Sequence, residues 1–166
     1  MNTSMLHAAV SLCFALSSGE EAPYAGQQDR QIKSLSEQQI AGYEAGRGMG
    51  FAKVAELNHY PGPKHVLELA TDMSLTREQR EQVVSAYNVM HEQTVALGKE
   101  LVQQERELDM LFAGGDAGDE AVRAFIAEIA RIEGEIRFAH VRAHLVTRQI
   151  LDTSQIETYD RLRGYR

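Results

Sequence analysis

The chain has 166 residues, of which 43% are hydrophobic, 7% are aromatic and 25% are charged. This length is sufficient for one domain with its own core. The formal net charge is −7, and the basic residues are interspersed with acids rather than gathered into a patch. Because such a surface repels phosphate backbones, we expect no nucleic-acid partner.

The composition also predicts the fold class. Tryptophan is absent, and Val, Ile and Thr rarely cluster, so that strand signals are scarce. Ala, Leu, Glu, Gln and Arg, which favour helices, are frequent. We therefore expect an all-α protein.

The N-terminus carries an apolar run of about 12 residues, 5–16 (MLHAAVSLCFAL). A helix needs about 20 residues to cross a bilayer, so the run is too short to span one but suits the core of a signal peptide. It is atypical because no Lys or Arg precedes it. We expect a signal peptide within residues 1–22, its cleavage point open, and export to the periplasm. The alternative is a short buried or misassigned segment. Cys13, the only cysteine, lies in this run.

The segment 23–35 is polar and has no sustained period, which predicts a flexible tether before a helical domain at 36–166. The first helix is expected to begin at Ser36, which can form a capping box with Gln39. Its apolar stripe would consist of Ile40, Tyr43, Val54 and Leu57. The glycines at positions 46, 48 and 50 interrupt this helix, and they indicate close packing against another helix or a local bend.

The sharpest break in the pattern is the stretch 58–63 (NHYPGP), because Pro61 disfavours helix at the preceding residue and Gly62 permits a turn. Pro63 suits the first position of a new helix. A short helix is expected from Pro63 to about Met73.

Two long helical patterns follow, joined by the glycine-rich turn 114–118. The first, from Thr76 to about residue 113, can begin with a capping box formed by Thr76 and Gln79. The second runs from Asp119, expected as its cap, to residue 150. Apolar residues recur at 3-4 spacing in both, which predicts a long antiparallel helical hairpin. Since a hairpin with short flanking helices cannot close a thick core, we also expect a homodimer.

Four short motifs resemble one known family. Leu75-Thr76-Arg77-Glu78-Gln79 matches the L-T-x-x-Q motif of the Spy/CpxP-like periplasmic proteins. A second copy stands at residues 151–155 (LDTSQ), where Asp152 replaces the family's threonine and is an equally good cap before Gln155. The stretches 58–69 (NHYPGPKHVLEL) and 159–165 (YDRLRGY) also look like proteins of this group that are labelled heavy-metal sensors or refolding chaperones.

The resemblance implies a cradle-shaped, ATP-independent helical dimer. Its relatives either hold unfolding proteins or bind transition metals and signal to a membrane-anchored partner. No nucleophile stands with a base and an orienting carboxylate, so we do not expect an enzyme. No cofactor is expected to be required, and a transition metal (Zn, Cu, Ni or Co) is the candidate ligand.

Histidines provide the candidate metal site. His140-x-x-x-His144 places two imidazoles one helical turn apart, as ligands of Zn, Cu, Ni or Co require. Folding the hairpin at its turn brings His91 near His140, so that three histidines could converge. The alternative is that these histidines are solvated rim residues. For a second group, His65 and Glu68 with His59 nearby, we expect helix-end solvation rather than metal binding.

The function remains open between three hypotheses at this point. A chaperone would need an apolar client surface, for which the candidates are Met49, Phe51, Val66, Leu69 and Met73. A metal sensor would use the three histidines. A third hypothesis is a non-catalytic module that only dimerises.

Overall fold

A computed structural model describes residues 22–165. Within this range the chain forms helices and no strand, so the prediction of an all-α fold is confirmed. The helices are α1 (Glu37–Glu44), α2 (Lys53–Glu56), α3 (Pro63–Glu68), α4 (Arg77–Gly114), α5 (Asp119–Ile150) and α6 (Thr153–Arg163). Residues 1–21 of the predicted signal peptide, Cys13 among them, lie outside the described residues. None of the helices described is both long enough and apolar enough to cross a membrane.

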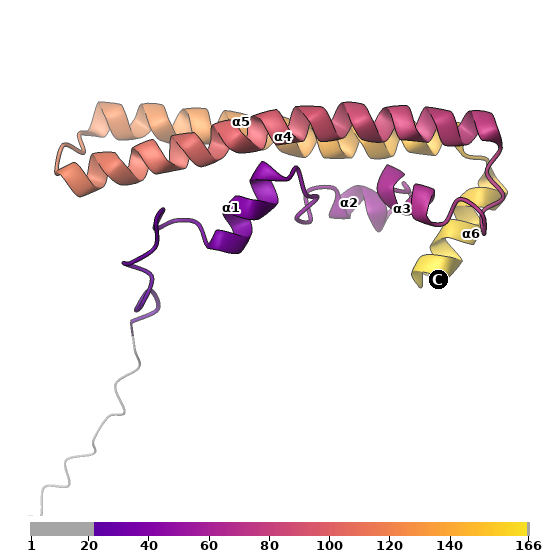
Figure 1. The fold of residues 1–166 in the computed structure, drawn as a ribbon, viewed down its shortest axis with the longest axis horizontal. Coiled ribbons are helices and arrows are strands. Elements are labelled where there is room, and N and C mark those ends of the chain that lie inside the picture. The colour runs from indigo at the N-terminus through magenta and orange to yellow at the C-terminus, as the bar shows by residue number, and fades with distance from the viewer. Residues whose placement is uncertain (1–21, 166) are drawn as a thin grey trace, which may run out of the picture.

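Helices α4 and α5 form the predicted antiparallel hairpin and lie side by side along their length (Figure 1). The capping box of Thr76 and Gln79 starts α4, and Gly115, with a φ of 81°, ends it in the left-handed conformation. The prediction of Asp119 as the cap of α5 is wrong, because Gly118 occupies that position. Asp119 lies in the first turn instead, where its negative charge interacts favourably with the helix dipole.

The short helices α1, α2 and α3 follow one another along the hairpin, and α6 folds back at its open end (Figure 1). They bury apolar side chains in two clusters. The first joins the segment around α1 to the middle of the hairpin: Ile32, Leu35, Tyr43, Leu101, Val102, Ile132 and Ile136. The second joins α3 and α6 to the hairpin's open end: Val66, Met73, Val83, Leu151, Ile156 and Tyr159.

The predicted tether is too long at its C-terminal end. Ile32 is fully buried, and Leu35 also belongs to the core. Lys33 forms an ion pair of 3.0 Å with Asp109 of α4. Two apolar residues three positions apart anchor this segment, so the packed domain begins before Ser36.

The first predicted helix is two helices. The chain leaves α1 after Glu44 and resumes helix at Lys53, with left-handed backbone at Gly46, Met49 and Gly50 between them. The break redirects α2, so Val54 and Leu57 are exposed and do not continue the stripe of α1. Helix α3 likewise ends at Glu68 rather than near Met73, and turns connect it to α4.

Candidate functional site

A cavity of about 460 Å³ lies between the hairpin and the segment that carries α2 and α3. His91 of α4 lines it, as do His140 and His144 of α5, so the three predicted histidines share one cavity. The loop between α1 and α2, the Pro-Gly turn before α3 and Arg163 of α6 complete its walls. The site therefore draws on nearly every element of the fold.

His140 is buried, with 4% of its surface exposed. Its ring stacks on that of Phe51, with centroids 5.9 Å apart and planes inclined by 7°. Burial and, secondarily, the neighbouring His144 lower the pKa of His140 to about 4, against the opposing effect of a hydrogen bond with the backbone of Arg47. His140 is therefore neutral at pH 7.

His140 Nε2 is buried and has no hydrogen-bond partner within residues 22–165. The proton of His144 can be assigned from its partner. His144 Nδ1 lies 2.7 Å from the carbonyl oxygen of Tyr60, and since a carbonyl only accepts, Nδ1 donates. In its neutral form this ring then keeps a lone pair on Nε2. Metal-ligating histidines are held in this way, with the other nitrogen donating to a carbonyl or a carboxylate.

Gly62 preserves space in front of His144. A Cβ at this position would lie 3.0 Å from His144 Nε2 and 2.9 Å from Cε1. The φ of Gly62 is −80°, a value that any residue can adopt, so its requirement is steric and not conformational.

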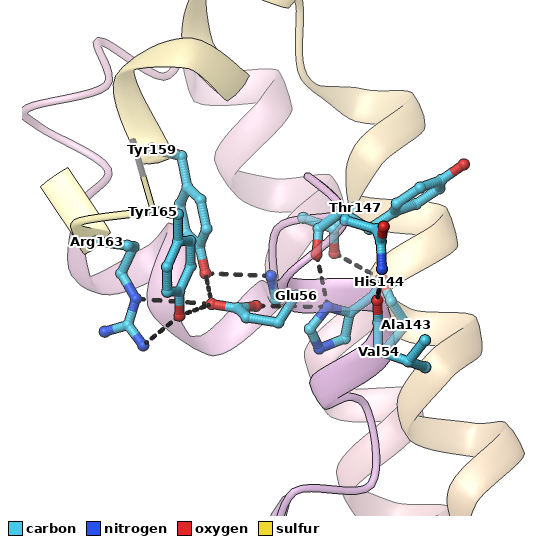
Figure 2. A network of polar contacts seen from close by, with 11 residues as sticks. Val54, Glu56, Ala143, His144, Thr147, Tyr159, Arg163 and Tyr165 are labelled. Carbon is cyan, nitrogen blue, oxygen red and sulfur yellow. Dashed lines mark hydrogen bonds and ion pairs between the residues drawn. The ribbon is translucent and has the colours of Figure 1, made fainter. Parts of the chain in front are cut away.

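Glu56 joins the cavity to the C-terminal helix (Figure 2). Its Oε1 accepts hydrogen bonds from the hydroxyls of Tyr159, at 2.5 Å, and Tyr165, at 3.0 Å, and lies 3.6 Å from Arg163 Nε. Its Oε2 lies 3.6 Å from His144 Nδ1. Burial, followed by the bond to Glu56, raises the pKa of Tyr159, which keeps this phenol protonated as a donor. Our sequence analysis missed Glu56, because no spacing rule links one acid on a short helix to histidines almost ninety residues later.

The remaining histidines do not complete a ligand set. His91 lines the cavity but stacks on Tyr87, with centroids 5.6 Å apart. His65 pairs with Glu68 at 2.8 Å, whereas His59 pairs with Asp160 of α6 at 2.7 Å. In the part of the chain that the structure describes, no three His, Cys, Asp or Glu side chains are grouped closely enough to hold a metal ion.

Most of the residues predicted to form a client surface are not exposed. Val66 and Met73 are buried beneath α6, and Phe51 and Leu69 are partly buried against the two core clusters. Only Met49, which is 43% exposed, is accessible. The reason for this difference is long-range packing, against the cluster around α1 for Phe51 and against the cluster that includes α6 for the others, which local spacing does not reveal.

A groove of about 620 Å³ runs along the hairpin itself. It is lined by α4 and α5 alone: Gln82, Ser85, Ala86, Val89, Met90, Gln93, Ala139, Arg142, Ala143, Val146, Gln149 and Ile150. Val89 and Val146 are exposed on it. This groove and the histidine cavity are separate hollows in the described part of the chain, because only the second is lined by histidines and by residues from outside the hairpin.

Comparisons of the chain with protein-family models, with curated proteins and with solved structures gave no match.

Proposed function

We propose that this protein binds a transition-metal ion through Nε2 of His140 and Nε2 of His144. The observation that carries the proposal is that both rings line one cavity, where His144 Nδ1 donates to the carbonyl oxygen of Tyr60 and the buried His140 Nε2 has no hydrogen-bond partner among residues 22–165. In the exported setting that the sequence predicts, such a protein would act as a metal sensor or regulator on a membrane-anchored partner.

The donor set indicates which metals suit the site. Imidazole nitrogen binds Zn, Cu, Ni and Co well, whereas Mg and Ca prefer oxygen ligands. The bond from His144 Nδ1 to the carbonyl oxygen of Tyr60 fixes the orientation of that ring before the metal arrives. The Glu56 carboxylate lies beside the same nitrogen, with its Oε2 3.6 Å from His144 Nδ1.

The test is a titration of Zn²⁺, Cu²⁺, Ni²⁺ and Co²⁺ by calorimetry, with thermal melts in parallel. A ligand at a hundred times its dissociation constant stabilises the native state by about 2.7 kcal/mol, which a melt detects readily. We expect His140→Ala and His144→Ala to abolish both signals. The control is His65→Ala, since this ring lines the cavity but is not grouped with His140 and His144 as a third ligand in the described part of the chain.

Gly62→Ala provides a sharper variant, because it keeps both imidazoles. Its methyl group would occupy the space 3.0 Å from His144 Nε2, so we expect metal affinity to fall although both ligands remain. If all these variants bound metal as the unmodified chain does, the proposal would be wrong.

A second function, the holding of unfolding proteins without ATP, is favoured by the groove of α4 and α5. Val89, which is 60% exposed there, offers apolar surface next to the charged Arg142. We expect Val89→Lys to weaken the suppression of aggregation of a model client. Val54→Lys, at a valine that is 57% exposed on α2 outside the groove, is the matched control.

The groove has a competing occupant in a second copy of the chain, as the predicted homodimer requires. Sedimentation of the same two variants separates these possibilities. If Val89→Lys converts a dimer to a monomer and leaves aggregation suppression unchanged, the groove is a dimer interface and does not hold clients.

A further inference from the structure

The histidine cavity carries a charge opposite to that of the whole chain. The sequence has 24 acidic and 17 basic residues, yet the cavity is lined by four permanent cations and a single acid. The cations are Arg47, Lys53, Lys64 and Arg163, and the acid is Glu56. A positive wall of this kind attracts anions and opposes the entry of a bare divalent cation.

The protein neutralises only part of this charge. Glu56 is the partner of Arg163, and its Oε1 also accepts from the hydroxyls of Tyr159 and Tyr165 (Figure 2). Lys64 reaches the exposed Glu68 at 4.0 Å. Arg47 and Lys53 are left, and neither forms an ion pair with any residue in the described range 22–165.

The coordination requirement of the proposed metal also indicates a ligand from outside the chain. Zinc commonly takes four ligands, and His140 and His144 provide two. Among the residues described, no third histidine, cysteine or carboxylate is grouped with them. Glu56 Oε2 lies beside His144 Nδ1, on the nitrogen that donates to Tyr60, and not beside the lone pair. The remaining positions are therefore open to donors from outside the chain.

We infer that the cavity takes its metal together with a small carboxylate anion, which Arg47 and Lys53 hold while His140 and His144 bind the metal. The inference rests on the proposed metal-binding function and adds the ligand that completes the site. An anionic oxygen offsets the positive wall and fills an open position, and guanidinium and ammonium groups are suitable partners for a carboxylate. His140 lines the same cavity, and its buried Nε2 has no partner among residues 22–165, so this nitrogen is left for a metal held beside the anion.

The experiment uses Co²⁺, whose visible spectrum reports its ligands, and compares acetate with perchlorate at constant ionic strength. We expect acetate to tighten Co²⁺ binding by roughly tenfold, as one charge-assisted contact would, and to change the Co²⁺ spectrum. Arg47→Ala combined with Lys53→Ala should remove this gain while leaving the affinity in perchlorate at least as high. Both positions are exposed, so the fold should survive, and circular dichroism checks it. Arg80→Ala combined with Lys99→Ala, at exposed cations of α4 outside the cavity, is the matched control.

The possible results separate the two proposals. If Co²⁺ binds in neither salt, the metal-binding function fails. If Co²⁺ binds equally in acetate and perchlorate, metal binding stands and the anion inference is overturned. It is also overturned if the Arg47 and Lys53 variant keeps the full effect of acetate. A gain with bicarbonate that equals the gain with acetate supports the inference and extends the ligand to small oxyanions.

Discussion

Gln79 and Gln155 exchange a reciprocal pair of amide hydrogen bonds, each of 2.9 Å, between the first turn of α4 and the first turn of α6. Each glutamine is also the third residue of its helix and completes a capping box there. Its side-chain oxygen accepts from the backbone N–H of Thr76 or Asp152. Gln79 further donates to the carbonyl oxygen of Ile150, at the end of α5. The two related motifs therefore do more than start their own helices, because they bind α4, α5 and α6 to one another.

This pairing predicts energetic coupling between two positions 76 residues apart in the sequence. Gln79→Ala and Gln155→Ala should each destabilise the fold, and the double variant should lose less than their sum by about 1 kcal/mol. Urea unfolding of the four proteins measures this difference. Gln82→Ala, an exposed glutamine one turn along α4, should change stability little. Strict additivity would show that the amide pair is not maintained in solution.

Gly98 should tolerate no side chain, because α1 crosses α4 at this residue. A Cβ there would overlap the carbonyl group of Tyr43. We expect Gly98→Ala to cost at least about 2 kcal/mol, because the backbone of α1 must move. Gly134→Ala, in α5 where a Cβ would meet nothing within 4 Å, should instead stabilise the protein by up to about 1 kcal/mol. Equal effects in thermal melts would contradict the close crossing.

Tyr159→Phe should weaken the attachment of α6. The hydroxyl donates to Glu56 Oε1 and accepts from the backbone N–H of Gly62, and the side chain is fully buried. Its removal leaves a buried carboxylate short of one donor, at a cost of about 1–3 kcal/mol. Tyr165→Phe removes the other hydroxyl from a more accessible ring, so its cost in the same denaturation assay should be smaller. The reverse order would assign the main support of Glu56 to Tyr165.

Asp152 gives the start of α6 a dependence on pH. A hydrogen bond from the Ser154 hydroxyl, followed by one from the backbone N–H of Gln155, lowers the pKa of this carboxyl group. A group with a lowered folded-state pKa stabilises the fold above its unfolded-state pKa, and this contribution is lost as the pH falls through the folded-state value. Between about pH 5 and about pH 2, stability should therefore fall further in the unmodified chain than in Asp152→Thr, whose cap does not titrate. Parallel losses across this range would exclude a role for the charge.

The hairpin could be predicted because its signals are local. Apolar spacing of three and four residues predicts both helices of the hairpin, and the caps at Thr76 and Asp152 define where α4 and α6 start. The placement of His140 and His144 one turn apart follows from the same geometry. These features require no knowledge of how distant segments pack.

The rest of the candidate site could not be predicted, because it depends on the path of the chain between α1 and α3. Met49 and His59 adopt positive φ values of 42° and 65°, which non-glycine residues rarely do and which nothing in the composition signals. Those turns bring Glu56 and the carbonyl of Tyr60 to His144, and Arg47 to His140.

The far end of the hairpin lacks the layer that the short helices provide elsewhere (Figure 1). Beyond Asp109 on α4, the last residue to which the N-terminal segment is tied, Met110 and Phe112 are exposed, as is Ile126 on the returning helix. Local unfolding there would expose little additional apolar surface, so its free energy should be well below that of the whole molecule. Amide hydrogens of the tip should therefore exchange with solvent first, and those near Thr94 and Ile136 last. The hairpin would thus open from the tip while the histidine cavity keeps its shape.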